Sequence, residues 1–562
     1  MSETRQLWDV PVAMRDGVCL SADIYLPAGG VEGGPYPTVL SRTPYSNQNP
    51  VYVEGAQQLS AAGYAVVLQD VRGRHDSDGD WLPFRNEGRD GYDTVEWTAE
   101  QSWSNGRIGT MGGSYGGWFQ WALAREKPPH LVTMVSTAPC GDWMHELPWN
   151  NGVMMLVMFG WLNLTGGRAM QNPNLVEDWP SVFRHLPLRT MDERIGRSLP
   201  EWQDWLNHPC LDDYWSTLRF DDDFGRIDIP TLHITGWYDG DQPGALYFHR
   251  GMRASSPRAE DQYLVIGPWD HGGTRVPRRV VGDVDFGADA LVDVLGLHRE
   301  WFDHWLKDEA PVPLKERTRL FITGVNEWKD TPTWPPPAES VAWFLHSDGS
   351  ANTFAGDGTL TADAPTDAEP DDTLIYDPVD PVPSVVDPNF YSPDAVETPL
   401  DHRFKQRRDD VLVYTSAPVS ETMIVAGLPS VQLFAATDGP DTDWFVALHA
   451  VSPTGKAMLL CEGHLRGRYH EGVDHESLLQ SQQIYEFSIA MSAVGHAVQP
   501  GHRLRLTVTS SDFPTWDRNP NTGHPIGLDT ELRVATNRVR HQPGAASFVS
   551  LPVVPATIFA GG

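Results

Sequence analysis

The sequence predicts a multidomain protein in which an α/β domain, interrupted by a helical insertion, is followed by an all-β domain. Short apolar runs alternate with helical patterns in the first part of the chain. A stretch rich in Trp, Met and Leu interrupts that alternation, and alternating apolar and polar residues dominate the last part. At 562 residues the chain is also too long for a single hydrophobic core.

The first part of the chain begins with two strands, which we expect in 9–26 about a turn at Asp16-Gly17. Strands that are buried on both faces appear as continuous apolar runs, and their alternation with helices indicates a parallel sheet. Such runs occur at 38–41, 65–69, 107–111, 132–136, 231–235 and 263–266. Helical patterns between them include 90–100 and 115–126.

The interruption runs from about Trp143 to Phe224 and has helical periodicity with no clear strand, so we expect a helical cap over the sheet edge. After Trp334-Pro-Pro-Pro, alternating runs separated by Gly, Pro and Asp turns predict a β-sandwich or jelly roll. These runs lie at 430–437, 444–452 and 502–509. The expected boundaries are 1–142 and 226–337 for the α/β domain, 143–225 for the cap and 338–562 for the β domain.

Composition excludes several classes of partner. The formal net charge of −33 argues against nucleic acid or an anionic membrane as a partner. The sequence contains no apolar run of membrane-spanning length and begins without a signal-peptide pattern. The four cysteines are scattered and form no CxxC motif, which is typical of thiols in a reducing compartment. We therefore expect a cytoplasmic protein.

One short stretch, Met111-Gly-Gly-Ser-Tyr-Gly-Gly-Trp118, is the first sign of chemistry. It contains Gly-x-Ser-x-Gly at 112–116, preceded by a strand pattern and followed by a helical one. This context indicates a sharp turn that holds Ser114 up as a nucleophile, because glycines on both sides leave room for a strained backbone. A plain Gly-rich strand–helix connection is the alternative.

A serine nucleophile needs a base, and the base needs an acid that orients it. In a parallel sheet both groups are expected just beyond the carboxyl ends of later strands. The last two strand patterns lead into Asp239 and His271, which gives the chain order Ser, Asp, His. Asp270 adjoins His271, but adjacent residues rarely face each other as this pair would have to. Asp241 lies two residues beyond Asp239, which we keep as the predicted acid.

Acyl transfer also needs donors for the oxyanion. The helix that begins at Tyr115 directs its free N–H groups towards Ser114. The sequence has no Gly-rich oxyanion loop after the early strand, where Ser41-Arg-Thr-Pro-Tyr-Ser46 stands instead. Pro44 has no N–H, but the Tyr45 hydroxyl can donate. We therefore predict an oxyanion hole formed by the Tyr115 N–H and the Tyr45 hydroxyl.

No metal or cofactor is expected. Asp76, Asp78, Asp80 and Glu87 occupy four positions of a calcium-loop pattern, but Trp81 stands where that loop requires glycine. The histidines at 464, 470 and 475 have no metal-ligand spacing, and no zinc or nucleotide motif occurs.

Several longer stretches make the chain resemble the cocaine-esterase-like hydrolases, a family related to X-prolyl dipeptidyl peptidases and α-amino acid ester hydrolases. They are RDGVCLSADIYLP, RTPY, QDVRGRHDSDGDW, MGGSYGG, GWYDG, GPWDHGG, YDPVDPVPS and SSDFPTWDRNPNTG, spread nearly from end to end. The resemblance implies an α/β-hydrolase domain with an inserted helical cap and a C-terminal jelly roll. It also implies a triad of Ser114, Asp239 and His271 with Tyr45 as oxyanion donor, which agrees with the prediction from spacing.

The residue at position 241, which is Asp in this chain, distinguishes branches of the family that act on different substrates. In the cocaine-esterase branch this position is aromatic and lines the acyl pocket. In α-amino acid ester hydrolases it is acidic and belongs to a carboxylate cluster that holds the substrate's ammonium. This chain lacks that group's secretion signal, and the sequence does not identify the other members of a cluster. Alternatively, Asp241 turns outward or begins a helix as the N-cap ahead of Pro243.

Five aromatic residues are candidates for the substrate pocket: Trp149, Phe159 and Trp161 in the cap stretch, and Phe390 and Tyr391 where the family's jelly roll touches the site. We predict that they line an apolar acyl or leaving-group pocket. Plain core packing is the alternative for each.

The sequence thus predicts a serine hydrolase that cleaves a small-molecule ester or amide through an acyl-enzyme, without a cofactor. An X-prolyl dipeptidyl peptidase and an α-amino acid ester hydrolase or acylase are the alternatives within this class. From another class, the β domain suggests a carbohydrate-binding or scaffolding protein with a vestigial hydrolase. The sequence does not determine the oligomeric state, and a homodimer is compatible with it.

Overall fold

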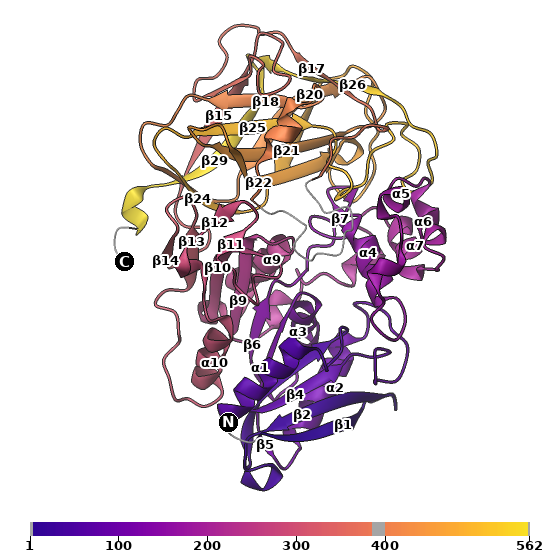
Figure 1. Ribbon diagram of the computed structural model, residues 1–562, viewed down its shortest axis with the longest axis vertical. Helices are drawn as coiled ribbons and strands as arrows, with labels where there is room; N and C mark the ends of the chain where they lie inside the picture. Colours follow the sequence, from indigo (N-terminus) through magenta and orange to yellow (C-terminus); the bar gives the residue numbers. More distant parts are fainter. Residues whose placement is uncertain (1–3, 385–398, 560–562) are drawn as a thin grey trace.

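The computed structural model describes residues 4–384 and 399–559, which form an α/β part, a cap and a β part (Figure 1). In the view of Figure 1 the α/β part lies at the bottom, the β part at the top, and the cap helices at the right between them. Phe390 and Tyr391 lie outside the described residues. The three parts follow the order that the sequence predicts, while the exact boundaries between domains stay a prediction.

The α/β part is built on a ten-stranded sheet with the order β1-β2-β4-β3-β5-β6-β9-β10-β13-β14. Neighbouring strands are parallel from β4 to β13 and antiparallel at both edges. The bounds are β1 Arg5–Ala13, β2 Cys19–Leu26, β3 Tyr36–Thr43, β4 Ala65–Asp70, β5 Ser104–Gly113, β6 Leu131–Thr137, β9 Thr231–Tyr238, β10 Gln262–Asp270, β13 Thr318–Ile322 and β14 Glu327–Thr331. The six apolar runs expected as strands all fall within β3, β4, β5, β6, β9 and β10.

Helices cover both faces of this sheet, because successive side chains of a strand point to opposite faces. In β4, Ala65 and Val67 join the core that includes α3 and the cap, whereas Val66 and Leu68 join the core beneath α1 and α10. The helices are α1 Pro50–Ala61, α2 Glu87–Ala99, α3 Tyr115–Arg125, α9 Gln242–Ser255 and α10 Val294–Trp305. Strands buried on both faces explain the continuous apolar runs in the sequence.

The cap lies between β6 and β9. Its helices are α4 Val157–Thr165, α5 Trp179–Phe183, α6 Met191–Arg194, α7 Pro200–Asn207 and α8 Asp213–Ser216. The prediction that this segment contains no strand was wrong, because β7 (Trp149–Asn150) and β8 (Val153–Met154) form a hairpin. Asn151 and Gly152 both have positive φ at its turn, and Asn-Gly is the dipeptide that such turns prefer. Strands of two residues are too short to show the alternation of apolar and polar residues by which a strand is predicted from sequence.

The C-terminal part is mostly β and has a hydrophobic core of its own. The three expected strands appear as β20 (Ser430–Thr437), β21 (Asp443–Val451) and β25 (Arg503–Thr509). β21 lies between β25 and β22 (Ala457–Arg466), and the part extends from β15 (Glu339–His346) to β29 (Phe548–Val554).

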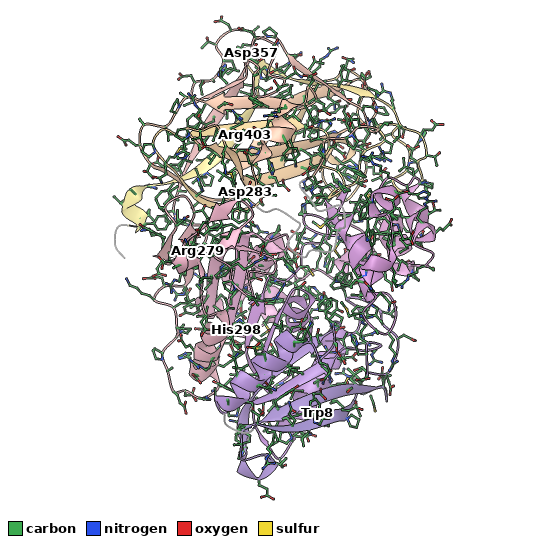
Figure 2. The ribbon with its side chains drawn as sticks, viewed as in Figure 1. Trp8, Arg279, Asp283, His298, Asp357 and Arg403 are labelled. Atoms are coloured by element: carbon green, nitrogen blue, oxygen red, sulfur yellow. The ribbon has the colours of Figure 1, made fainter. Side chains whose placement is uncertain are left out.

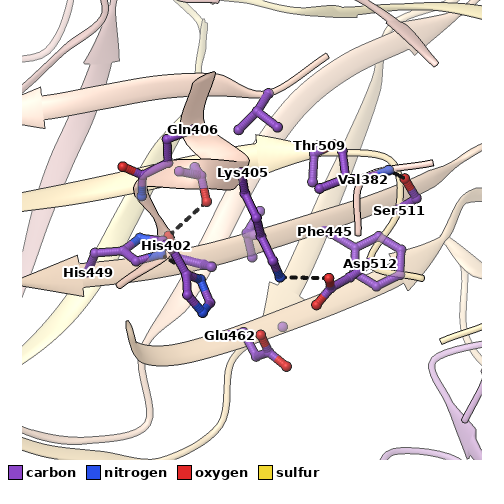
Figure 3. A pocket seen from close by; sticks show the side chains of 15 residues that line it. Val382, His402, Lys405, Gln406, Phe445, His449, Glu462, Thr509, Ser511 and Asp512 are labelled. Atoms are coloured by element: carbon purple, nitrogen blue, oxygen red, sulfur yellow. Dashed lines mark hydrogen bonds and ion pairs between the residues drawn. The ribbon is translucent and has the colours of Figure 1, made fainter. Parts of the chain in front are cut away.

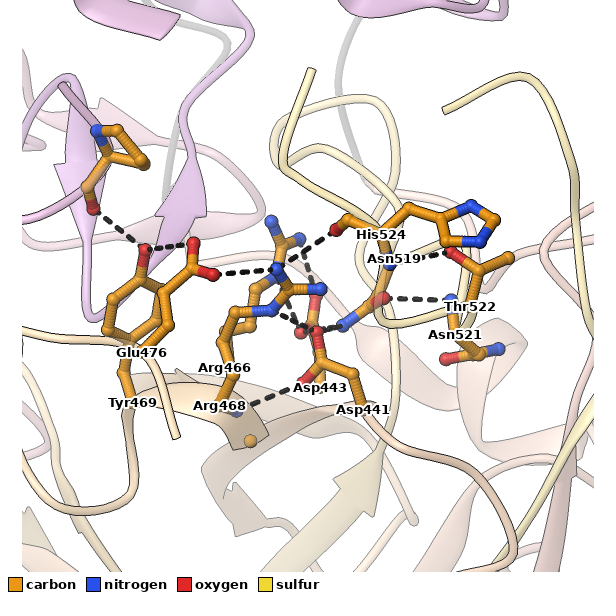
Figure 4. Close-up of polar contacts among 12 residues, drawn as sticks. Asp441, Asp443, Arg466, Arg468, Tyr469, Glu476, Asn519, Asn521, Thr522 and His524 are labelled. Carbon is orange, nitrogen blue, oxygen red and sulfur yellow. Dashed lines mark hydrogen bonds and ion pairs between the residues drawn. The ribbon is translucent and has the colours of Figure 1, made fainter. Parts of the chain in front are cut away.

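A buried polar network fixes the cap to the β part (Figure 4). Arg466 is 2 % exposed and its Nη2 donates to Asp517 Oδ1 at 3.0 Å. The same carboxylate oxygen accepts the N–H of Met154 in the cap hairpin at 2.8 Å. Nearby, the Tyr469 hydroxyl donates to the Pro209 carbonyl of the cap at 2.9 Å. Separating the cap from the β part would therefore break the hydrogen bonds of Met154 and Pro209. Arg466 and Asp517 would stay paired within the β part.

Side chains fill the space between the ribbons of the three parts (Figure 2). Asp283 lies where the α/β part meets the β part, and its carboxylate accepts the N–H of Asp401 at 3.3 Å.

All four cysteines are free thiols. Among the described residues, no helix is long and apolar enough to cross a membrane.

Candidate active site

Ser114 lies at the sharp turn between β5 and α3. Its φ is 60° and its ψ is −128°, a conformation that non-glycine residues rarely adopt and that the surrounding structure must hold. A Cβ on Gly112 would lie 2.5 Å from the carbonyl oxygen of Gly116, so only glycine fits there. Ser114 is partly exposed at the start of α3, where the first N–H groups have no intrahelical partner. The local geometry is that of a presented nucleophile.

Asp239 and His271 meet beyond the carboxyl ends of the neighbouring strands β9 and β10. Nδ1 of His271 lies 2.7 Å from Oδ1 of the fully buried Asp239, and the Thr235 hydroxyl donates to Asp239 Oδ2 at 3.0 Å. Asp270, the competing acid, instead accepts the N–H of Gly273 at 2.7 Å. A carboxylate on Nδ1 selects the tautomer that leaves Nε2 of His271 able to accept a proton.

Tyr45 follows β3, the strand next to β5, and its hydroxyl faces Ser114. Burial raises the pKa of Tyr45, and hydrogen bonds with Trp161 and Ser114 lower it only in part. The phenol is therefore neutral at physiological pH and keeps a proton that it can donate. Together with the first N–H of α3, at Tyr115, it forms a pair of donors around the serine.

Asp241 also faces this site. Its Oδ2 lies 3.8 Å from Nδ1 of His271 and the residue is 9 % exposed, so the alternative that it turns outward was wrong. Asp241 does hold the N-cap position of α9, but its side chain makes no capping hydrogen bond. Its N–H donates to Asp239 Oδ1 at 3.1 Å. The carboxylate therefore faces the imidazole and does not cap the helix.

A second acid beside Asp241, Glu146, was not found from the sequence. Glu146 is 1 % exposed, and its Oε2 accepts the N–H groups of Gly141 at 2.8 Å and Asp142 at 2.9 Å. Within the described part of the chain, its Oε1 is buried without a hydrogen-bond partner. Burial raises the pKa of Glu146 well above its ordinary value, and the Asp241 carboxylate raises it further. No sequence pattern links two acids so far apart in the chain.

The charges around His271 decide its proton affinity. Burial lowers the pKa of His271 and Arg275 lowers it further, but the carboxylates of Asp241 and Asp239 outweigh both, so the pKa is raised. Burial raises the pKa of Asp239, but His271 outweighs that effect and the pKa is lowered. Burial raises the pKa of Asp241 to about 6. Near neutral pH, Asp239 is therefore ionised beside an imidazole of increased basicity.

Behind the turn at Ser114 lies a buried ion pair that sequence reasoning missed. Nη1 of Arg42 lies 2.8 Å from Oε2 of Glu87, with side chains 0 % and 2 % exposed. Arg42 Nε donates to Gln69 at 2.7 Å, and Glu87 Oε1 accepts the Tyr115 hydroxyl at 2.8 Å. The pair therefore joins β3, β4 and α2 to the residue that follows the serine. In the sequence, Glu87 stood out only as part of the rejected calcium pattern.

Two of the predicted pocket aromatics lie in the core of the cap. Trp149 is fully buried, and its indole N–H donates to the Trp205 carbonyl at 3.3 Å. Phe159 is fully buried and packs edge-on against Trp202, with ring centroids 5.0 Å apart. Core packing accounts for both positions, so their role in substrate binding stays a prediction.

Trp161 is placed differently from these two residues. It is only partly buried, and its indole N–H donates to the Tyr45 hydroxyl at 2.9 Å. The cap thus reaches the predicted oxyanion donor directly. For Phe390 and Tyr391, which the described residues do not include, the pocket-lining prediction also remains.

A small cavity in the β part is separate from these residues (Figure 3). It offers about 40 Å³, which is room for a few water molecules. Lys405 crosses it and forms an ion pair with Asp512 at 2.7 Å. Neither Ser114 nor His271 lines this cavity. It therefore does not serve the candidate active site.

Comparison with known proteins covers nearly the whole chain. Residues 16–273 match the family described as X-Pro dipeptidyl-peptidase (S15 family), and residues 304–550 match the X-Pro dipeptidyl-peptidase C-terminal non-catalytic domain. The cocaine esterase of Rhodococcus sp. (strain MB1 Bresler) is 33 % identical, over 97 % of this chain and 98 % of that protein.

Solved structures agree with this match. An α-amino acid ester hydrolase has a TM-score of 0.88 at 28 % identity, covering 98 % of this chain and 97 % of that chain. An aminopeptidase from a marine sediment Thaumarchaeota archaeon has a TM-score of 0.87 at 27 % identity, covering 99 % and 97 %.

The fold, the family matches and these relatives define an enzyme of the serine hydrolase class, built on an α/β-hydrolase domain with a C-terminal, mostly β domain. More particularly, the chain belongs to the cocaine-esterase-like hydrolases of the X-Pro dipeptidyl-peptidase (S15) family.

Proposed function

We propose that this enzyme cleaves a carboxylic ester or amide through an acyl-enzyme formed on Ser114. The observation that carries the proposal is the 2.7 Å contact between His271 Nδ1 and the buried Asp239. Asp239 follows β9, which lies two strands from β5, and β5 leads into a serine held at positive φ. An imidazole oriented by a buried carboxylate is the base that a serine nucleophile requires.

In the first half of the reaction, Ser114 Oγ attacks the carbonyl carbon while His271 Nε2 takes its proton. The Tyr45 hydroxyl and the Tyr115 N–H donate to the oxyanion, and the bond to the leaving group breaks as His271 returns the proton to it. In the second half, water attacks the acyl-enzyme and loses a proton to the same nitrogen. The bond between the acyl carbon and Ser114 Oγ then breaks, His271 returns the proton to Oγ, and the acid leaves. Asp239 stays ionised throughout and stabilises the imidazolium.

Labelling with a fluorophosphonate tests the nucleophile. We expect one adduct on Ser114 and none in Ser114→Ala, with kcat of that variant on the order of 10⁶-fold lower. An alanine variant that kept more than a few per cent of activity would show that another residue is the nucleophile. An unlabelled wild type would favour the binding or scaffolding alternative, since a vestigial hydrolase has no activated serine.

A second candidate substrate class is an α-amino acyl compound, whose ammonium would bind Asp241 and Glu146. The observation that favours it is the free Oε1 of Glu146, a buried acceptor without a partner in the described structure, next to a second carboxylate at the imidazole. Opposite charge stabilises ionised acids, so an ammonium group would compensate for the burial of both. The names of two relatives, an aminopeptidase and an α-amino acid ester hydrolase, agree with this substrate class.

The two substrate classes differ in one measurement. Esters of an α-amino acid are compared with esters of its deamino analogue in wild type, Asp241→Asn and Glu146→Gln. If Asp241 and Glu146 bind an ammonium group, the wild type should prefer the amino ester. Each variant should reduce that preference by raising KM for the amino ester. Asp222→Asn, which changes an exposed carboxylate of the cap, serves as the control and should keep the preference. No preference in the wild type would leave neutral esters as the substrate class.

Aminoacyl-prolyl p-nitroanilides test the remaining alternative, an X-prolyl dipeptidyl peptidase. Turnover of p-nitrophenyl esters without turnover of these amides would favour the esterase. We also infer that the C-terminal β part is a jelly roll, which its large core and long-range strand order support.

A further inference from the structure

Trp161 joins the cap to the predicted oxyanion hole. It lies on α4 of the cap, and its Nε1–H donates to the Tyr45 hydroxyl oxygen at 2.9 Å. An indole nitrogen can only donate, so the phenol oxygen must be the acceptor in this contact. This contact therefore does not use the single proton of the Tyr45 hydroxyl, which stays available for an oxyanion at Ser114. Ser114 lies close enough to lower the pKa of Tyr45.

This direction matters for the reaction. An oxyanion needs a proton pointed at it, whereas a freely rotating hydroxyl spends part of its time pointed away. When the phenol donates to a developing negative charge, its own oxygen becomes more negative, and a donor already bound to that oxygen then binds more strongly. The indole therefore both orients the hydroxyl and supports it as charge develops.

Neighbouring residues hold the indole in place. Trp161 stacks on Phe84 and Tyr115, with ring centroids 5.7 Å and 6.1 Å away and interplanar angles of 25° and 23°. The Tyr115 ring is itself fixed, because its hydroxyl donates to Glu87 at 2.8 Å and accepts the N–H of Phe84 at 3.1 Å. The indole thus rests on rings that belong to the α/β part and not to the cap.

Arg74 fixes the two backbones relative to each other. Its guanidinium is fully buried and donates to the Pro44 carbonyl, directly before Tyr45, at 2.9 Å. It also donates to the Thr165 carbonyl, at the end of α4, at 2.6 Å. One rigid side chain therefore spans the oxyanion loop and the helix that carries Trp161. Such a link is expected where the distance between two groups must be kept constant.

We propose that Trp161 is a positioning residue for the oxyanion donor, so that the cap completes the catalytic machinery instead of only covering it. This inference rests on the proposed role of Tyr45. It differs from a pocket-lining role, in which the indole would contact substrate and act through KM.

A double-mutant cycle tests the inference. Steady-state kcat and KM for a p-nitrophenyl ester are measured in wild type, Trp161→Phe, Tyr45→Phe and the double variant. We expect Trp161→Phe to lower kcat roughly 3- to 10-fold, the worth of one neutral hydrogen bond, with little change in KM. In the Tyr45→Phe background the same change should have no further effect on kcat, because the hydroxyl that it orients is gone.

Two controls separate orientation from packing. Replacing Trp161 by 3-benzothienylalanine keeps the shape of the ring and removes only the N–H, so it should reproduce the loss of kcat without a change in melting temperature. Trp143→Phe removes another cap indole, whose N–H donates to the Leu218 carbonyl at 3.2 Å and not to Tyr45. Its effect on kcat should be the same in both backgrounds.

The outcomes are distinct. If Trp161→Phe lowers kcat by the same factor with and without the Tyr45 hydroxyl, or changes only KM, the positioning role is refuted while the oxyanion hole stands. If the benzothienyl variant keeps full kcat, the N–H has no role and the positioning role is likewise refuted. If Tyr45→Phe alone leaves kcat unchanged, the proposed oxyanion hole fails and this inference fails with it.

Discussion

Replacing Glu87 by glutamine should destabilise the α/β part severely, although it changes one atom and no volume. Arg42, with a side chain 0 % exposed, would keep its charge and lose the carboxylate 2.8 Å away. Removing one partner of a buried ion pair costs about 3–5 kcal/mol, because the remaining charge is left without compensation. At roughly 2 °C or more per kcal/mol, the melting temperature should fall by about 6 °C or more.

Urea denaturation, monitored by tryptophan fluorescence, measures the loss in free energy of unfolding of Glu87→Gln. Two controls identify the cause of that loss. Asp93→Asn breaks the exposed pair with Arg15, whose side chain is 48 % exposed, and should cost about 1 kcal/mol or less. The double variant Arg42→Met, Glu87→Met removes both charges and should be more stable than Glu87→Gln. A loss below about 1 kcal/mol in Glu87→Gln, or a double variant as unstable as the single one, would refute the reasoning.

Three further changes test the site. Tyr45→Phe should lower kcat about 10²–10³-fold with little change in KM, and an unchanged kcat would place the second oxyanion donor elsewhere. Asp241→Asn removes a carboxylate that raises the pKa of His271, so the acid limb of the kcat/KM profile should move to lower pH; a limb that stays in place would contradict this. Gly112→Ala brings a Cβ to 2.5 Å from the Gly116 carbonyl oxygen and should lower both melting temperature and activity, and a normal melting temperature would contradict the geometry.

Local sequence was enough for much of the fold and for predicting which residues would meet at the centre of the candidate site. The runs expected as strands coincide with β3, β4, β5, β6, β9 and β10, because strands buried on both faces must be apolar throughout. Ser114 could be predicted as the nucleophile because the sharp turn that holds it requires glycine at 112, which is a local requirement. The contact between Asp239 and His271 follows from the same logic, since β9 and β10 are neighbours and both side chains come directly after a strand.

Short elements were harder to predict. The cap hairpin of β7 and β8 was missed because strands of two residues show no periodicity, although Asn151-Gly152 is a strong turn signal. Trp149 lies fully buried in the cap, and its predicted place at the substrate stays a prediction. An aromatic residue in a cap has the same sequence pattern whether it faces the core or the site, so only packing distinguishes the two.

The sequence by itself determined which polar groups stand at the strand ends: a serine on a strained turn, an acid and a histidine in the order that a triad needs, and a tyrosine in place of a Gly-rich loop. The tertiary structure alone decided which distant groups surround them. Glu146 comes to lie beside Asp241, Arg74 joins the oxyanion loop to α4, and Trp161 reaches Tyr45. These contacts join elements that are separate in the chain, and no local propensity specifies them. They arise when the cap packs onto the sheet: Arg74 and Trp161 find hydrogen-bond acceptors across that contact, whereas Glu146 Oε1 is buried there without a partner among the described residues.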